Sequence, residues 1–577
     1  MNKQSTPTKI VLMTGVFTTV AFTHFFFDSL MLPKFIVLFF GSSVAFYLFS
    51  RLNQKMLFNP KTIVILSSLL ISSLILSGLT NHMAIYQILF GDWARYNGLL
   101  SYIFYMILFL LSSFSQSRTY LKSIITVLVY LGYFILIVGL LELSGNNITG
   151  IISTDPHLKL TLGNSNFASV IIVITFSATY SNLIYKKELN YRKIFLLISI
   201  ALHIFLLYKT SATQGIVVLI FAVMFQTGIR FLASRSALNI KIGNTILFSI
   251  PIIGVYTVFD YIFKGPVSHV VSIKTLVDRF YIWKTAISMW KDNLLTGVGI
   301  DSFGSWFGQY QNTESLKYKV ITENYDNAHN IFLNFLATGG LLVFIAYCSI
   351  TFFIAYCAFK LLKKKNYDSN LVALISIWLV IQIQALVSID YLSISTWNWI
   401  IAGAIVSEYY FQKNDVIPKS NEKVYFAISK FASIGLRIVS IFIICITIVL
   451  LLPTVKAEYK INDLITDKKY ALNSPELQLV NSDILSLALD IKYPDIKIYS
   501  VSALETFGDL SGALELAIDS TSRFPRSTRS WATLAHIYEV TGNKKLAVES
   551  WKKASELDPL NSIYKAKSSE NLLTEVN

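Results

Sequence analysis

His329 and Asn330 stand where a polar stretch, "ENYDNA", meets a long apolar run. The apolar run, 331–359, is long enough to cross a bilayer. An imidazole has an unperturbed pKa of about 6.5, so it can accept a proton from a hydroxyl at neutral pH. A histidine at a membrane interface can also be only a cap or a polar anchor. A base at this depth would meet a substrate carried by a lipid.

Arg279 lies in the long loop before His329, residues 262–329. A guanidinium keeps its charge and can chelate two phosphate oxygens at once. Arg279 begins a stretch whose large apolar residues recur at helical spacing, namely Phe280, Trp283, Ile287 and Trp290. This spacing predicts an amphipathic helix along the membrane surface. Gly297 and Gly299 follow, and we expect them to break the helix and free backbone N–H groups.

The acidic residues of this loop are scattered rather than grouped as metal ligands: Asp278, Asp292, Asp301, Glu323 and Asp326. Neither a metal nor a cofactor is predicted. The three cysteines, Cys348, Cys357 and Cys445, fall inside apolar runs. Their spacing fits neither a metal site nor a disulfide framework.

Of the 577 residues, 54% are hydrophobic and only 14% are charged, which excludes an ordinary soluble globular protein. Backbone groups in lipid must be satisfied within the segment, and the apolar runs are continuous rather than alternating. We therefore predict an all-α polytopic membrane protein of about 12–13 transmembrane helices. The predicted spans are 10–31, 35–50, 62–79, 98–115, 121–143, 167–185, 194–208, 214–233, 244–261, 330–359, 370–388, 394–410 and 431–452.

Basic residues separate the connecting segments into two sets. One set of alternate segments, including the N-terminus, holds 22 Lys and Arg residues. The short loops of the other set hold only Lys34, Arg95, Lys159 and Lys209. The positive-inside rule places the first set in the cytoplasm of a bacterial inner-membrane protein, and the loop 262–329 outside it. The excess of basic charge then contacts membrane lipids, and nucleic acid is not a predicted partner.

The segment after the last span, 454–577, contains an internal repeat. "FGDLSGALELAIDSTSRFP" and "TGNKKLAVESWKKASELDP" align at a shift of 34 residues. The second copy has the alanine and aromatic spacing of a tetratricopeptide repeat (TPR), in which small residues let two helices pack closely. We predict two domains, 1–453 in the membrane and 454–577 outside the cytoplasm, the latter TPR-like. Such repeats offer a groove to peptides or proteins, although a helical hairpin domain without a ligand stays open.

Several motifs together resemble the O-antigen ligase and polymerase superfamily, which includes protein O-oligosaccharyltransferases. In the loop they are "RFYIW", "GVGIDSF" and "AHNIFLN" followed by "GG". Two further outward segments, "GDWARYNGLLSY" (91–102) and "TLGNSNFAS" (161–169), are also similar. The resemblance extends over roughly residues 90–400, and a TPR-like tail is familiar in this family.

The resemblance implies transfer of an oligosaccharide from a polyprenyl-diphosphate donor to an acceptor hydroxyl outside the cytoplasm. The acceptor is lipid A core, a protein Ser/Thr or a surface glycan. His329 would act near the acceptor hydroxyl and Arg279 would engage the diphosphate, so these two are the catalytic candidates. The candidate substrate contacts are Arg95, Asn164, Asn166, Lys209, Gln214, Trp283, Gly297, Gly299 and Asn330.

One position departs from the family. In the turn "KTSATQGIVVL", Gln214 stands where the family usually has an arginine. An amide can donate a hydrogen bond but brings no charge, so Lys209 or Arg95 would have to compensate. Asn164 and Asn166 can also simply cap the span that follows them.

Three other functions stay open. A surface-polysaccharide polymerase would share this topology. A transporter of lipid-linked glycan is disfavoured, because mid-span charges are few and the two halves are not repeated. A membrane-anchored TPR scaffold would leave the loop 262–329 without a purpose.

Overall fold

The computed structural model describes residues 5–52, 55–56, 60–93, 95–115, 118–146, 148–149, 156–185, 191–262, 273–314, 325–364, 368–415, 426–427, 430–465, 474–491 and 493–569. Its helices before the loop 262–329 are α1 Ser5–Val20, α2 Met31–Ser50, α3 Lys61–Thr80, α4 Ile85–Phe90, α5 Leu99–Ser113, α6 Arg118–Leu143, the 3₁₀ helix η1 Leu160–Leu162, α7 Ser165–Tyr185, α8 Tyr191–Lys209, α9 Thr213–Leu232 and α10 Ala237–Ile262. The later helices are α12 Ile273–Asp292, α13 Phe303–Tyr310, α14 Ile331–Lys363, α15 Ser369–Ala385, α16 Leu392–Asp415, α17 Lys430–Ile465, α18 Pro475–Asp490, α19 Pro494–Thr506, α20 Leu510–Arg523, α21 Thr528–Val540, α22 Lys544–Leu557 and α23 Ser562–Lys567.

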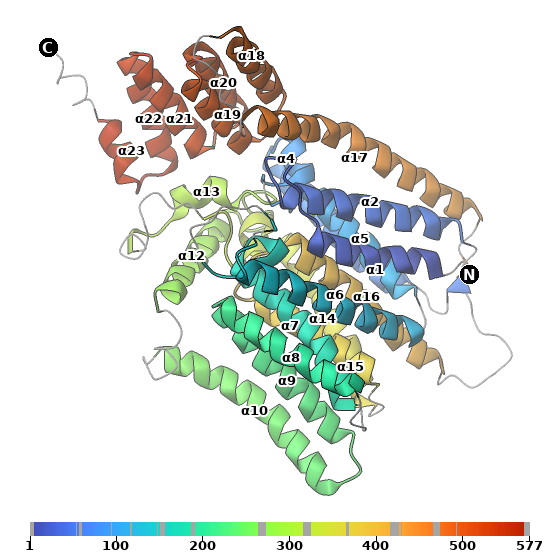
Figure 1. Ribbon diagram of the computed structural model, residues 1–577. Coiled ribbons are helices and arrows are strands. Elements are labelled where there is room, and N and C mark those ends of the chain that lie inside the picture. Colours follow the sequence, from blue (N-terminus) through green and yellow to red (C-terminus); the bar gives the residue numbers. More distant parts are fainter. Residues whose placement is uncertain are drawn as a thin grey trace.

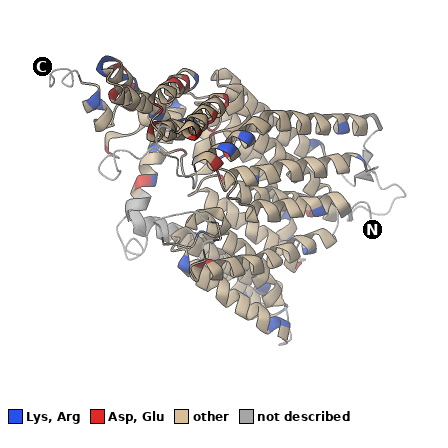
Figure 2. Cartoon of the chain, turned by 45° about the horizontal axis from the view of Figure 1, so that its top comes forward, with Lys and Arg blue, Asp and Glu red and all other residues tan. Residues whose placement is uncertain are grey.

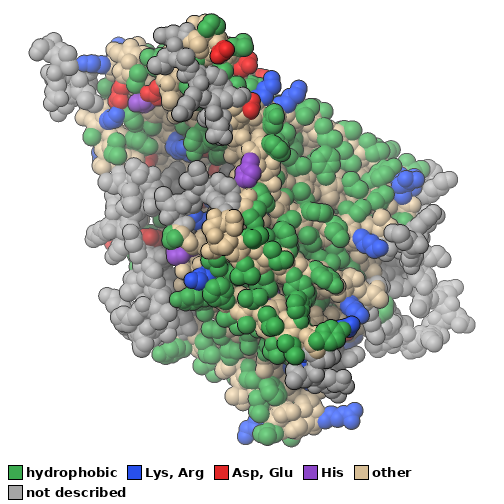
Figure 3. Space-filling view, viewed as in Figure 1, with side chains coloured by type: hydrophobic (Ala, Val, Ile, Leu, Met, Phe, Trp, Pro, Cys, Tyr) green, Lys and Arg blue, Asp and Glu red, His purple; other side chains and the backbone are tan. Residues whose placement is uncertain are grey.

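The prediction of an all-α membrane protein is confirmed. Each of the thirteen predicted spans overlaps a helix, namely α1–α3, α5–α10 and α14–α17, although the first predicted span, 10–31, extends past the end of α1 at Val20. In the described part of the chain, nine helices are long and apolar enough to cross a membrane. Apolar side chains cover the bundle in a broad green surface (Figure 3). Many large apolar side chains of the bundle helices are exposed, such as Phe248 and Phe352. Lipid solvates such a surface, whereas water would not. The chain is therefore a multi-pass membrane protein.

The two sets of connecting segments lie at opposite ends of the bundle. At one end, β1 (Lys55–Met56) pairs antiparallel with β2 (Phe426–Ala427), and Lys364 donates to the carbonyl of Gln412. These residues come from three connecting segments, all of which belong to the predicted cytoplasmic set. At the other end lie α4, α12, α13 and the C-terminal helices, far from the N-terminus (Figure 1). The assignment of the first end to the cytoplasm stays a prediction.

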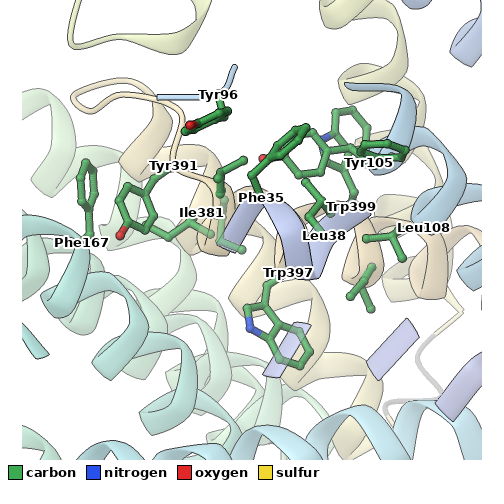
Figure 4. Packing of buried hydrophobic residues seen from close by; sticks show 14 of the residues in the cluster. Phe35, Leu38, Tyr96, Tyr105, Leu108, Phe167, Ile381, Tyr391, Trp397 and Trp399 are labelled. Carbon is green, nitrogen blue, oxygen red and sulfur yellow. The ribbon is translucent and has the colours of Figure 1, made fainter. Parts of the chain in front are cut away.

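An aromatic core ties the outer loops to the bundle. Figure 4 shows Tyr96, from the loop between α4 and α5, close to Phe35 of α2, and their rings stack with centroids 5.1 Å apart. Deeper in the bundle, the Nε1–H of Trp397 on α16 donates to the hydroxyl of Thr19 over 3.0 Å. Gly15 lies against the Trp397 ring, and an added Cβ would come within 2.9 Å of it. These contacts fix the loop around Tyr96 to a rigid base.

A kink in α14 receives the loop that follows α12. Gly340 has φ 65° and ψ −166° inside α14, which breaks the helical hydrogen-bond pattern. The N–H groups of Leu341 and Leu342 donate instead to the carbonyls of Leu294 and Leu295, over 2.9 and 3.2 Å. A Cβ on Gly340 would lie 2.3 Å from the backbone of Leu295, so only glycine fits. The "GG" of the sequence therefore joins α14 to the outer loop.

The C-terminal region forms stacked antiparallel helix pairs. Helices α19 and α20 begin 34 residues before α21 and α22, as the sequence repeat predicts. Gly508 and Gly542 occupy equivalent turns with φ of 82° and 79°. The repeat is thus a structural one, and its assignment as TPR-like stays a prediction. Helix α17 continues to Ile465, so it runs through the predicted domain boundary at Pro453.

The C-terminal helices contact the outer loops directly. Arg526 donates to the Gln309 side chain over 2.7 Å, and its guanidinium lies 3.2 Å from the ring centroid of Trp306 on α13. Glu458 near the end of α17 accepts from the Nε1–H of Trp93 over 3.0 Å. Figure 2 shows acidic residues gathered in the tail and in the adjoining end of the bundle. The tail therefore covers part of the end at which Arg95, Arg279 and His329 lie.

Candidate active site

His329 sits in a tight polar turn just before α14. Its backbone is left-handed, with φ 47°, a conformation that costs free energy in residues other than glycine and recurs at functional sites. Three asparagine side chains hold this turn through backbone N–H groups. Asn327 accepts from the N–H of His329 (2.8 Å), Asn330 from Leu333 (3.0 Å), and Asn334 from Ala328 (3.1 Å). Asn330 is thus the N-cap of α14, and its neighbour His329 is held in one orientation.

The imidazole of His329 is half-buried and carries no charge at neutral pH. Burial is the main cause that lowers its pKa, to about 4, and the charges of Arg279 and Arg95 lower it further. The Asp326 carboxylate acts in the opposite direction. The Tyr325 ring packs edge-on, with centroids 5.9 Å apart. Within the described residues, no group hydrogen-bonds the ring nitrogens, so a neutral imidazole nitrogen is free to accept a proton.

Arg279 reaches the same place from α12, fifty residues earlier in the chain. It is half-buried, and burial lowers the pKa of its guanidinium. No acidic side chain in the described part of the chain forms an ion pair with it. Trp283, one turn later on the same helix, has a buried Nε1–H without a hydrogen-bond partner among the described residues. A partly desolvated guanidinium without an acidic partner is suited to bind an anion.

Arg95 also approaches His329, but it is already paired. Its Nε donates to Asp326 Oδ2 over 2.6 Å, and its terminal nitrogen contacts the same oxygen. Loop 91–98, which carries Arg95, is closed by the Gly98 N–H donating to the Phe90 carbonyl over 3.2 Å. A Cβ on Gly98 would lie 2.3 Å from the Gly91 nitrogen, so this close approach requires glycine. Arg95 therefore links the loop 91–98 to the turn before α14.

A polar cavity opens beside His329. It has about 510 Å³ of empty volume, including its open mouth. Its charged side chains are Arg95 and three carboxylates, Asp301, Asp326 and Asp390. Four asparagines line it as well, namely Asn97, Asn327, Asn330 and Asn334. His329 and Arg279 are not among the lining residues, whereas Asn327 and Asn330, which flank His329 in the sequence, are.

The carboxylates of this cavity are buried and hydrogen-bonded. Asp301 accepts from the N–H of Asp92 over 2.7 Å, and burial is the main cause that raises its pKa to about 7. Asp390 accepts from the hydroxyl of Tyr102 over 2.7 Å and from Ser395, and burial raises its pKa to about 6. Near neutral pH each of these two groups is therefore divided between its neutral and ionised forms.

Four predicted substrate contacts lie elsewhere. Asn164 accepts from the N–H of Asn166 over 2.8 Å, which is the capping role at the start of α7. Gln214 donates to the carbonyl of Asn166 over 3.1 Å, while its Oε1 is buried without a partner in the described residues. Lys209 is exposed at the end of α8 with its ammonium over the Phe205 ring. The structure groups Asn164, Asn166 and Gln214 with one another but lines the cavity with none of the four.

The expectation that Gly297 and Gly299 free their N–H groups is wrong. Gly297 donates to the carbonyl of Asn293 and Gly299 to that of Thr338, each over 2.9 Å. Both have positive φ, and a Cβ on Gly297 would lie 2.5 Å from the Ala337 carbonyl oxygen. These glycines let the loop approach the kinked backbone of α14. Their N–H groups thus form hydrogen bonds within the protein, and their contact with substrate stays a prediction.

Sequence reasoning missed several residues of the cavity. Asn97 follows Arg95 within the quoted motif, and Asn327 and Asn334 flank His329. A search for polar residues beside the chosen ones would have found them. Asp390 gave a weaker signal, a carboxylate in a short predicted outer loop between two spans. In the described part of the chain, no three His, Cys, Asp or Glu residues are grouped closely enough to hold a metal ion.

Comparison with known proteins agrees with the resemblance over part of the chain. Residues 160–348, about a third of the chain, match the family model described as O-antigen ligase. Comparison with curated proteins gives no match. The chain thus contains an O-antigen ligase domain, which includes Arg279 and His329, and is a glycosyltransferase. Such a domain implies transfer of an oligosaccharide from a lipid-linked donor to an acceptor.

Proposed function

We propose that the protein transfers an oligosaccharide from a polyprenyl-diphosphate carrier to an acceptor hydroxyl on the extracytoplasmic face of the membrane. Arg279 binds the diphosphate and His329 takes the proton. The observation that carries this proposal is the approach of a guanidinium without an acidic partner among the described residues to a neutral imidazole, from two elements fifty residues apart. The first supplies charge for a leaving group, and the second supplies a base.

The chemistry balances with these two groups. The acceptor oxygen forms a bond to the anomeric carbon of the donor glycan, and its proton passes to His329. The bond from that carbon to the phosphate oxygen breaks, and the polyprenyl diphosphate leaves with the bonding electrons. Negative charge grows on the leaving oxygen as the bond breaks, so a guanidinium placed there stabilises the transition state more than the ground state.

The low pKa of His329 suits the free enzyme. A protonated imidazole would be repelled by the positive charge of Arg279 and could not accept a proton. The pKa of about 4 keeps the ring neutral before the donor binds. Once a diphosphate lies against Arg279, its negative charge opposes that of the guanidinium and raises the pKa of His329. The donor itself thereby makes the base stronger.

The tail favours an acceptor that is presented from outside the membrane. It packs on α13 and on the loop 91–98, through Arg526 and Glu458. If its repeats are TPR-like, a peptide bound in their groove would be held near His329, which favours a protein Ser/Thr acceptor. Lipid A core, and a growing glycan as in a polymerase, are the other acceptors compatible with the same chemistry.

The test is transfer in proteoliposomes supplied with a polyprenyl-diphosphate-linked oligosaccharide. Three acceptors are offered in separate reactions, namely a Ser/Thr-rich peptide, lipid A core and the same oligosaccharide. The native protein is compared with the His329→Asn variant, because asparagine tolerates a positive φ and cannot serve as the base. Glycan product from only the native protein supports the proposal, and the acceptor that gains mass identifies the reaction. Equal product from the His329→Asn variant would refute it.

A further inference from the structure

We propose that the cavity beside His329 is a subsite for an uncharged sugar ring and that it rejects sugars bearing a carboxylate. This inference rests on the proposed function and assigns the chemistry of one substrate unit. The cavity is polar without being cationic. Arg95 is its one positively charged lining residue in the described part of the chain, and it is paired with Asp326.

The side chains that line the cavity match the hydroxyl groups of a sugar. Each hydroxyl both donates and accepts a hydrogen bond. Carboxylates such as Asp301 accept from hydroxyls, and asparagine amides can do either. Tyr102 and Phe335 line the same cavity, with ring centroids 5.6 Å apart, and offer an apolar surface to the C–H face of a pyranose. Asn97 donates to the Asp390 carbonyl over 3.2 Å, yet its buried Oδ1 has no partner in the described residues.

A second cavity continues the first into the bundle. The two share Ile331, Ile389 and Asp390, and the second has about 330 Å³ of empty volume. Gln384 lines it and is 1% exposed, but its Nε2 has no hydrogen-bond partner among the described residues. An amide left unpaired at this depth is costly, more so among helices that lie in lipid. Gln384 therefore holds a hydrogen-bond donor that no described residue uses, in a side chain that lines the second cavity.

The charge of the cavity decides which sugars fit. Asp326 already balances Arg95, so Asp301 and Asp390 leave the lining neutral to negative. A uronate or a phosphate placed there would meet like charge in a partly desolvated space. Arg279 is not among the residues that line this cavity, so the anionic diphosphate and the sugar ring have separate places.

Ligand-observed NMR can test this subsite without relying on catalysis. The intact protein in nanodiscs is titrated with methyl β-D-glucopyranoside and, separately, with methyl β-D-glucuronide. We expect saturation transfer to the glucoside and binding of the glucuronide that is about tenfold weaker, because one uncompensated like charge is enough for that ratio. In Asp301→Asn, which keeps an oxygen for the Asp92 N–H, the glucuronide should gain relative to the glucoside.

Two further variants separate the subsite from the reaction. Gln384→Leu should lose most of the glucoside signal, and an unchanged melting temperature shows that it folds. His329→Asn should keep the glucoside signal while losing transfer. Displacement of the glucoside by the lipid-linked donor assigns the subsite to the donor sugar, and displacement by the acceptor assigns it to the acceptor. Equal binding of both glycosides, or no effect of Gln384→Leu and Asp301→Asn, would overturn the subsite, whereas transfer by His329→Asn would overturn the proposed function instead.

Discussion

Arg279 and Arg95 both lower the pKa of His329 through their charge, yet they stand in opposite surroundings. Arg95 is held by Asp326 on the side of the acid-lined cavity, whereas Arg279 has no acidic partner in the described residues. The charge of Arg95 is neutralised by Asp326 within the fold, whereas the charge of Arg279 is available to bind an anionic ligand. The role of each arginine therefore follows from its ion-pair partner rather than from its residue type.

The roles proposed for the two arginines depend on His329 acting as the base. Replacing His329 with Asn should lower the transfer rate by about 10²–10⁴-fold, the usual contribution of a general base. The measurement is product formation in proteoliposomes at saturating donor. His24→Ala is the matched control, because His24 is exposed at the same end of the bundle and should leave the rate unchanged. A similar loss in both variants would point to a general defect.

Removing the unpaired cation should produce the next largest effect. Arg279→Gln should reduce kcat/KM for the donor roughly hundredfold, since two charge-assisted hydrogen bonds to the diphosphate are lost. Arg279→Lys should restore the charge but not the two-oxygen contact, and so recover part of the loss. Because Arg279 has no acidic partner in the described part of the chain, no second substitution in the protein should rescue Arg279→Gln. Full activity of Arg279→Gln would show that the diphosphate binds elsewhere.

Removing the paired cation should behave differently. Arg95→Gln should lower kcat/KM about tenfold or more, because it leaves the half-buried Asp326 uncompensated beside His329. The double variant Arg95→Gln/Asp326→Asn should regain most of this loss, since a Gln–Asn hydrogen bond can replace the ion pair. Kinetics of both single variants and of the double variant form a double-mutant cycle. Strictly additive losses would mean that Arg95 binds substrate directly.

The pH dependence sharpens the contrast. The active form of His329 is neutral, and its pKa of about 4 means that this form persists until the pH falls to about 4. The acid limb of kcat/KM, which reports the free enzyme, should therefore lie near that value rather than near neutrality. Arg95→Gln removes a charge that lowers the pKa, so its acid limb should move to higher pH. Asp326→Asn removes one that raises the pKa and should move it lower, and a limb unmoved in both variants would contradict the assignment.

Much of this arrangement was readable from the sequence. Apolar runs predicted the thirteen bundle helices α1–α3, α5–α10 and α14–α17, because lipid permits few other structures. The polar motifs predicted that Arg279 and His329 meet. Asp390 and Asn97 could not be paired in this way, since nearly 300 residues separate them and only the packing of α5, α14 and α16 joins them. The role of Gly297 was misread because a glycine can free an N–H or admit a close backbone, and the sequence does not say which.

The smallest effect on transfer should come from breaking the contact between the tail and the loop 91–98, which carries Arg95. Glu458 accepts from the Nε1–H of Trp93 and from the N–H of Asp28, each over 3.0 Å. Glu458→Leu leaves both donors without an acceptor, at a cost of about 1–3 kcal/mol each, and loosens the loop that carries Arg95. Hydrogen exchange in peptides covering 91–98 should rise, while the donor KM increases only a few-fold and kcat holds. Hydrogen exchange in peptides of α12, which carries Arg279, should stay at the native level, because Glu458 makes no hydrogen bond to the described residues of α12. An equal rise in exchange in both regions would contradict the different roles of the two arginines.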